Sequence, residues 1–182
     1  MAGMILVTGG CRSGKSGYAQ KIAESAPGVK TYIATCPCLD DEMAERIRKH
    51  KEMRKSRWVT IEETLDLAGA LSAAHKSPVI LVDCLTLWVN NLLYQAEILK
   101  KDFTEADMIW QCQKVFDACA SISGRVIFVT SEVGMGIVPA DSLSRRFRDL
   151  AGRCNQIMAE KADSVIAMIS GIPLTLKGDI RI

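Results

Sequence analysis

The chain has 182 residues, of which 48% are hydrophobic and 24% are charged, a balance typical of a globular protein rather than a disordered one. Its formal net charge of +2 gives no basic excess, so no nucleic-acid partner is expected. We expect neither a signal peptide nor a membrane span, because no apolar run approaches ~18 residues. Seven cysteines without a CxxC pair predict reduced thiols and a cytoplasmic location.

Apolar runs rich in β-branched residues predict buried parallel strands, and the stretches between them have helical patterns. Because parallel neighbours need crossover connections, this alternation specifies an α/β fold with a mostly parallel sheet flanked by helices. No repeat or linker divides the chain, so one domain over 1–182 is expected. In chain order we predict a strand at 5–8, a helix at 15–25, a weaker strand at 31–34, a charged helix at 40–55, a helix at 64–75, a strand at 79–82, a helix at 104–122, a strand at 126–130, a helix at 141–162, a weaker strand at 164–169, and a strand or hairpin at 174–182.

The strongest local signal is a phosphate-binding loop between the first strand and the first helix. Glycines let backbone N–H groups turn toward phosphate oxygens, and the following helix adds its positive end. Lys15 is expected to reach the β- and γ-phosphates, and the Ser16 hydroxyl to bind Mg²⁺. A chance glycine turn is the alternative reading. The pattern G-x-x-x-x-G-K-[ST] is filled by Gly9, Gly10, Cys11, Arg12, Ser13, Gly14, Lys15 and Ser16.

An acidic residue at the end of another buried strand would complete such a magnesium site, partly through water. Asp83 directly follows the strand predicted at 79–82. Aspartate after a strand also commonly caps the next helix, and the pattern leaves both readings open.

The charged segment at 40–55 contains one of the two histidines in the chain. Met43, Ile47, His50 and Arg54 fall on one face of a helix with this spacing. Nearby cations would keep the imidazole of His50 unprotonated and neutralise a phosphate, as a nucleophile attacking phosphorus requires. A surface histidine on a polar helix is the alternative. The other histidine, His75, lies near a helix end and is interpreted as structural.

Several segments together resemble one enzyme family, the bifunctional adenosylcobinamide kinase / adenosylcobinamide-phosphate guanylyltransferases of cobalamin assembly. The loop pattern alone is unspecific, whereas the runs at 132–139 (EVGMGIVP) and 147–156 are highly specific. Cys11 stands where the family usually has alanine, which removes no chemical group from the loop. The similar segments follow the family's order over almost the whole chain, at 4–16, 32–35, 41–50, 58–62, 83–93, 132–139 and 147–156.

The resemblance implies a P-loop NTPase fold of the RecA-like kind and two reactions. Such enzymes phosphorylate the aminopropanol hydroxyl of adenosylcobinamide with ATP or GTP. They then transfer GMP from GTP to the new phosphate through a covalent GMP–histidine, which yields adenosylcobinamide-GDP. The resemblance also implies a homotrimer. It assigns the nucleophile to His50 and further nucleotide contacts to Thr35, Lys51, Arg54, Glu62 and Asp83.

Three points stay open at this level. A monofunctional P-loop small-molecule kinase, with His50 only a surface residue, is one alternative function. A regulatory nucleotide-binding module is another. Glu132 is a candidate base for the acceptor hydroxyl, but a residue that caps a helix after a strand would look the same.

Overall fold

The computed structural model describes residues 3–37 and 58–179. The helix predicted at 40–55, with His50, Lys51 and Arg54, lies outside these residues. Within them, none of the helices is both long and apolar enough to cross a membrane.

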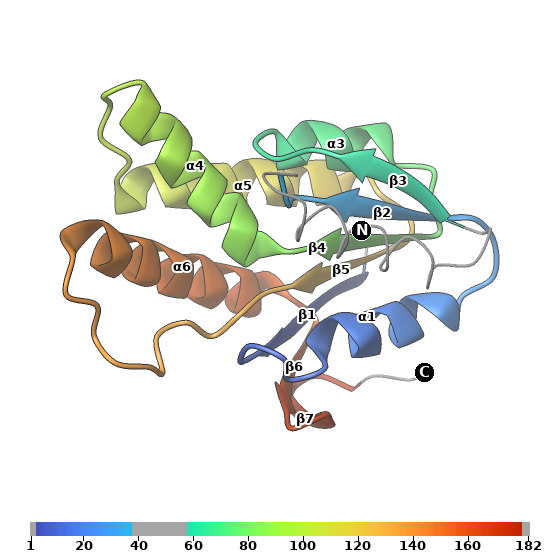
Figure 1. Ribbon diagram of the computed structural model, residues 1–182. Helices are drawn as coiled ribbons and strands as arrows, with labels where there is room; N and C mark the ends of the chain where they lie inside the picture. Colours follow the sequence, from blue (N-terminus) through green and yellow to red (C-terminus); the bar gives the residue numbers. More distant parts are fainter. Residues whose placement is uncertain (1–2, 38–57, 180–182) are drawn as a thin grey trace.

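One sheet of seven strands organises the described residues, in the order β3-β2-β4-β5-β1-β6-β7 (Figure 1). All neighbouring strands are parallel except β6 and β7, which form an antiparallel hairpin. Strand β1 lies between β5 and β6, so the strand that leads into the phosphate loop is paired on both edges. The strands are β1 (Gly3–Gly9), β2 (Lys30–Ala34), β3 (Trp58–Glu62), β4 (Val79–Asp83), β5 (Arg125–Val129), β6 (Ser164–Ile169) and β7 (Ile172–Lys177).

Helices cover both faces of this sheet, but unequally (Figure 1). Among the described helices, α1 packs against one face, and α3, α4, α5 and α6 pack against the other. The helices are α1 (Lys15–Glu24), α3 (Leu67–Ala73), α4 (Leu85–Ile98), α5 (Glu105–Ala120) and α6 (Ser142–Lys161).

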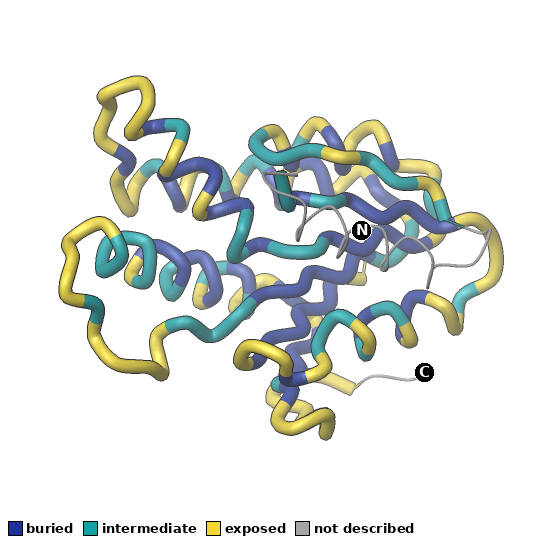
Figure 2. Tube along the Cα trace, viewed as in Figure 1, coloured by how far each residue is buried: buried dark blue, intermediate teal, exposed yellow. Residues whose placement is uncertain are grey.

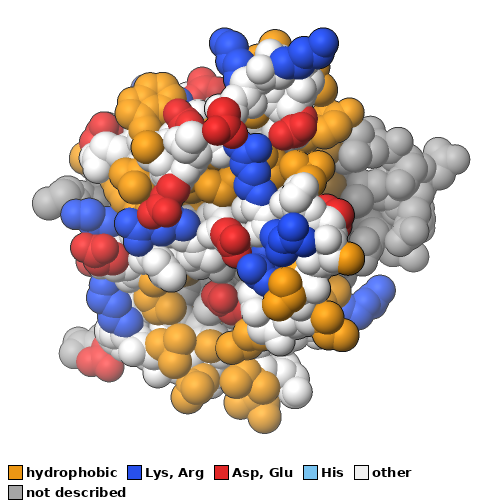
Figure 3. Space-filling view, turned by 90° about the vertical axis from the view of Figure 1, so that its left-hand side faces the viewer, with side chains coloured by type: hydrophobic (Ala, Val, Ile, Leu, Met, Phe, Trp, Pro, Cys, Tyr) orange, Lys and Arg blue, Asp and Glu red, His pale blue; other side chains and the backbone are white. Residues whose placement is uncertain are grey.

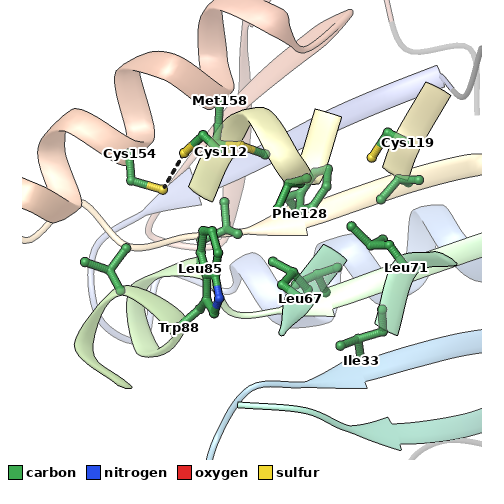
Figure 4. Close-up of a cluster of buried hydrophobic side chains, with 14 of the residues drawn as sticks. Ile33, Leu67, Leu71, Leu85, Trp88, Cys112, Cys119, Phe128, Cys154 and Met158 are labelled. Atoms are coloured by element: carbon green, nitrogen blue, oxygen red, sulfur yellow. Dashed lines mark hydrogen bonds between the residues drawn. The ribbon is translucent and has the colours of Figure 1, made fainter. Parts of the chain in front are cut away.

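Strand pleating divides the buried side chains into two core clusters. Alternate residues of a strand point to opposite faces, so Phe128 enters the larger cluster while its neighbours Ile127 and Val129 enter the smaller one. The central strands are buried along most of their length (Figure 2). In the larger cluster, Trp88 packs close to Leu85, and its indole Nε1 donates to the Leu65 carbonyl over 2.9 Å (Figure 4).

Most predicted elements are confirmed, including both weaker strands, and the end of the chain forms the hairpin strand β7. Two elements were not predicted. Helix α4 buries residues on much of its circumference, including Leu85, Trp88, Val89 and Leu92, so it lacks the one-sided pattern of a surface helix. Strand β3 is a short, half-buried edge strand in which the apolar Val59 is exposed, so its residues do not show a buried apolar run.

Candidate functional site

The phosphate loop follows β1 and ends where α1 begins, as predicted. Two of its glycines are required by their surroundings. A Cβ on Gly9 would lie 2.6 Å from the Met168 carbonyl oxygen and 2.7 Å from Ser13 Oγ, closer than such atoms approach. Gly14 adopts a φ of +92°, in the region that favours glycine, and supplies the turn into α1.

The turn between β6 and β7 braces this loop from outside. The Gly171 N–H donates to the Ser13 carbonyl over 3.0 Å. A Cβ on Gly14 would lie 3.3 Å from the Gly171 Cα, so the two backbones are in close contact. The conformation of the loop is therefore set partly by residues more than 150 positions later in the chain.

Ser16 and Asp83 face each other across the ends of β1 and β4. Ser16 Oγ lies 3.4 Å from Asp83 Oδ1, and the Tyr32 hydroxyl donates to Asp83 Oδ2 over 3.0 Å. Helix α4 begins after Cys84 and has no side-chain cap, so Asp83 does not cap it. The structure thus removes the alternative reading of Asp83 and brings it to the phosphate loop.

The oxygen donors at this point suit a magnesium ion. Mg²⁺ prefers hydroxyl and carboxylate oxygens, keeps several waters, and shares its ligands with substrate phosphates. In the described ranges no group of three or more His, Cys, Asp or Glu side chains is placed to hold a metal, so an all-protein cage is not the form such a site takes there. Ser16 and Asp83 are the two residues that fit.

The remaining described loop residues lie where an anion would meet them. Lys15 Nζ donates to the Gly10 carbonyl over 3.0 Å, folded over the loop. Ser13 Oγ is buried and has no hydrogen-bond partner among the described residues, which a phosphate oxygen would supply. Cys11 and Arg12 are exposed at the tip, and Arg12 has a φ of +55°.

Thr35 and Glu62 lie at the ends of the neighbouring strands β2 and β3. The fully buried Thr35 hydroxyl donates to the Cys84 carbonyl and accepts from the Cys84 N–H, each over 2.7 Å. These bonds join the end of β2 to the residue that follows β4. Glu62 is exposed at the edge strand, in register with Ala34.

A buried polar network adjoins the loop on the side of β5. Glu132 Oε1 accepts from the Thr8 hydroxyl over 2.7 Å and from Asn155 Nδ2 over 3.1 Å. The Asn155 amide oxygen in turn accepts from the Thr130 hydroxyl over 2.6 Å. The Glu132 N–H donates to the Gly9 carbonyl over 3.2 Å, so this residue is fixed directly beside the first loop glycine. Helix α6 is capped by Asp141, which removes the capping alternative for Glu132.

All of these groups lie at the carboxyl ends of parallel strands, where ligands of open α/β sheets bind. Figure 3 views the molecule from this side, and both acidic and basic side chains are gathered there. Cys84 also lies at this edge, but burial, followed by the nearby charge of Asp83, raises the pKa of its thiol to about 11. It is therefore protonated at neutral pH and unsuited to act as a nucleophile.

Sequence reasoning missed three residues that shape the site. Tyr32 holds Asp83, while Thr8 and Asn155 hold Glu132. No local pattern marks them, because each partner lies at least 23 residues away in the chain. His75, by contrast, lies just after α3, exposed and bonded through Nδ1 to the Ser72 carbonyl, as a structural histidine would be.

Comparison with known proteins places these features in a family. Residues 5–176 match the family described as cobinamide kinase / cobinamide phosphate guanyltransferase. The bifunctional adenosylcobalamin biosynthesis protein CobU of Salmonella typhimurium strain LT2 is 44% identical over 182 residues, which cover 96% of this chain and 99% of that protein. The protein of the same name from Escherichia coli K12 is 42% identical with the same coverage. The bifunctional protein CobP of Pseudomonas aeruginosa is 40% identical over 175 residues, 96% of this chain and 97% of that one. The chain belongs to the cobinamide kinase / cobinamide phosphate guanyltransferase family.

Proposed function

We propose that this protein is a bifunctional enzyme of cobalamin biosynthesis. It phosphorylates adenosylcobinamide with ATP or GTP, and it transfers GMP from GTP to adenosylcobinamide phosphate. The observation that carries this proposal is the phosphate loop facing Asp83 in a chain whose family is described by both activities. Both reactions would use the same binding site for the nucleoside triphosphate.

In the kinase reaction, the acceptor hydroxyl attacks the γ-phosphorus in line with the departing nucleoside diphosphate. The loop amides from Gly9 to Ser16 and the Lys15 ammonium hold the β- and γ-phosphates. Ser16 and Asp83 would hold Mg²⁺, in part through water, and when bound it neutralises charge on the phosphate oxygens. The catalytic contribution of the chain is then mainly positioning and electrostatic stabilisation.

In the transferase reaction, the neutral imidazole of His50 attacks the α-phosphorus of GTP and pyrophosphate leaves. The phosphate of the kinase product then attacks the GMP–histidine and releases the histidine, a double displacement. Lys51 and Arg54 are proposed to contact the nucleotide phosphates. Thr35 and Glu62 are proposed to hold the nucleotide from the ends of β2 and β3. The roles of His50, Lys51 and Arg54 rest on the sequence and the family resemblance.

We further propose one domain over 1–182, a homotrimer and a cytoplasmic location. The family match over 5–176 and the continuous sheet support a single domain. The six described cysteines are all free thiols, as a reducing compartment would leave them. The homotrimer rests on the family resemblance.

The covalent step is tested by incubating the protein with magnesium and GTP labelled at the α-phosphorus, then measuring acid-labile label on the denatured chain. The wild-type protein should be labelled, His50→Ala should not, and the matched control His75→Ala should retain wild-type labelling. Lys15→Ala should lose both labelling and kinase activity.

Absence of label on a wild-type protein that still phosphorylates adenosylcobinamide would replace this proposal with a monofunctional kinase. Label that persists in His50→Ala would move the nucleophile to another residue.

A further inference from the structure

The carboxylate of Glu132 is fixed at the carboxyl edge of the sheet, beside the phosphate loop. Strand β5 lies between β1, which ends in the phosphate loop, and β4, which ends in Asp83. Glu132 follows β5 by three residues and is tied to the Gly9 carbonyl through its backbone. Its backbone therefore lies at the carboxyl edge of the sheet, between the ends of β1 and β4, and its side chain lies on the α6 side of that edge.

We propose that Glu132 takes the proton from the acceptor hydroxyl in the kinase reaction, and that Thr8 and Asn155 orient its carboxylate for this role. This inference rests on the proposed function and deepens its kinase half. Glu132 is the catalytic residue in this scheme, because it meets the reacting hydroxyl. Thr8 and Asn155 act through it and are positioning residues.

The hydrogen bonds leave one oxygen of Glu132 for this role. Both donors, the Thr8 hydroxyl and the Asn155 amide, bond to Oε1. Within residues 3–37 and 58–179, no hydrogen bond to Oε2 is found, and the residue is only half-buried. A carboxylate that is held through one oxygen, on a residue that is not fully buried, keeps its second oxygen available as a general base.

The other carboxylates at the strand ends suit this role less well. Asp83 is engaged on both oxygens, by Ser16 and by Tyr32. Glu62 lies at the end of β3, the edge strand that three others separate from β1. Of these three carboxylates, Glu132 is therefore the one that lies beside the phosphate loop and has one oxygen without a hydrogen bond among the described residues.

The orienting network is itself rigid, because it is buried and bonded at every step. Asn155 is 7% exposed and Thr130 is 1% exposed. The Thr130 hydroxyl fixes the amide oxygen of Asn155, so the Asn155 NH₂ group must point toward Glu132 and the Ser131 carbonyl. Thr86 extends the network by donating or accepting at Thr130 over 3.2 Å and by receiving the Ser131 N–H over 2.7 Å.

The step balances as an ordinary phosphoryl transfer. A bond forms between the hydroxyl oxygen and the γ-phosphorus, while the bond from that phosphorus to the β,γ-bridging oxygen breaks. The nucleoside diphosphate keeps the electron pair of the broken bond, and the hydroxyl proton moves to Glu132 Oε2 and then to solvent. The transferase reaction has no hydroxyl to deprotonate, since its nucleophiles are a neutral imidazole and a phosphate anion. Loss of the Glu132 carboxylate should therefore separate the two activities.

The test compares Glu132→Gln with the wild-type protein in two assays on full-length chains. Glutamine keeps an amide oxygen that accepts the bonds of Thr8 and Asn155, but it cannot take a proton. We expect the kinase kcat with adenosylcobinamide to fall about 100-fold or more, the usual scale of general base catalysis. Self-labelling from α-labelled GTP, the KM for nucleotide and the Tm should stay at wild-type values.

Two variants test the positioning role with a separate readout. Thr8→Val is nearly isosteric and removes one donor to Oε1, and Asn155→Ala removes the other donor without placing a second carboxylate beside Glu132. Each should lower kcat about 5- to 50-fold, part of the range for a general base, with little change in KM. A structural role alone would instead lower Tm and both activities together.

The outcomes separate the two proposals. Full kinase activity in Glu132→Gln overturns the inference while the proposed function stands. Equal loss of kinase activity and of self-labelling in that variant also overturns it, since Glu132 would then serve nucleotide binding. A wild-type protein that forms no adenosylcobinamide phosphate overturns the proposed function itself.

Discussion

The two faces of the sheet are covered differently: one contributes most to the stability of the fold, and the other carries the phosphate loop. Four helices cover one face and form the larger core cluster, whose fully buried side chains include Trp88, Phe128 and Met108. Of the helices in residues 3–37 and 58–179, only α1 packs on the other face, with Ala19, Ile22 and Ala23 as its buried residues. Small side chains let this helix lie close to the sheet.

The thinly covered face is the one tied to the phosphate loop, because α1 begins where that loop ends. The position of the phosphate loop therefore depends on a few buried side chains of α1, of which Ile22 is the largest. The thickly covered face holds most of the apolar surface removed from water, and so most of the hydrophobic stabilisation. Substitutions on the face covered by four helices should mainly lower the free energy of unfolding. Substitutions on the face covered by α1 should also lower the affinity for nucleotide.

The largest expected effect is Phe128→Ala on the thick face (Figure 4). Removing a fully buried phenyl ring should lower the free energy of unfolding by about 3–5 kcal/mol. Urea denaturation measures this change, and GTP affinity measured on the folded fraction should stay within about twofold, because sites without shared partners are nearly independent. A large loss of affinity in the folded protein would contradict the division between the faces.

A smaller loss of stability is expected from Ile22→Ala on the thin face. The cost should fall in the lower half of about 2–5 kcal/mol, because a single helix can settle onto the shortened side chain. The same movement displaces the start of α1, so GTP affinity should fall several-fold. The control Ile22→Val should cost about 1 kcal/mol and keep the affinity near that of the wild-type protein. Unchanged GTP affinity in Ile22→Ala would show that the loop is held independently of this face.

Acid should first destabilise the face covered by four helices, because the N-termini of two of these helices, α5 and α6, are capped by carboxyl groups that become protonated at low pH. The bonds from Thr104 to Asp107 at the start of α5, and from Ser144 to Asp141 at the start of α6, lower the pKa of each carboxyl below 3.8. A carboxyl with a depressed folded-state pKa stabilises the fold above its unfolded pKa, and that stabilisation is lost as pH falls through the folded value. Helix α1 has no such side-chain cap.

The measurement is Tm between pH 7 and pH 3 for the wild-type protein and for Asp141→Asn. Asparagine keeps a capping oxygen without a titrating charge, so the variant should show a shallower fall in Tm below about pH 4, near the reference pKa of aspartate. Parallel curves for both proteins would remove Asp141 from the acid response.

The smallest expected effects are differences in how fast individual cysteine thiols are modified in the folded protein. Burial raises the pKa of Cys119 to about 12, and the thiol of Cys154 is also raised well above its ordinary value by Cys112 and by burial. Both lie on the thick face and should resist a thiol reagent at pH 8 until the protein unfolds. Exposed Cys11 should react in the native protein, and GTP should slow its modification. Mass spectrometry of labelled peptides with and without GTP checks both expectations.

Much of this architecture could be predicted from local pattern, and the exceptions have physical causes. The phosphate loop is one continuous segment in which backbone geometry and residue type coincide, so it is visible in eight consecutive positions. Helix α4 was missed because burial on many sides erases its period. Strand β3 was missed because it is short and lies at the sheet edge, where apolar and polar residues are not sorted into a buried run.

For the network around Glu132, the sequence pointed only to Glu132 itself, and it left open whether this residue is a general base or a helix cap. Its function depends on Thr8 and Asn155, which approach it only when β1, β5 and α6 pack together. No local sequence pattern predicts such partners, because the distance between them and Glu132 is set only when the chain folds. The tie between Tyr32 and Asp83 was missed for the same reason.

The brace between Gly171 and the phosphate loop has a consequence for how the protein is made. The loop is translated before β5 and β6, with which its strand β1 pairs, and before the β6–β7 turn, which supplies its outer support. A nascent chain that stops before that turn carries the complete loop sequence without the contacts that shape it. Nucleotide binding should thus appear only after the β6–β7 turn has been translated and has folded against the loop.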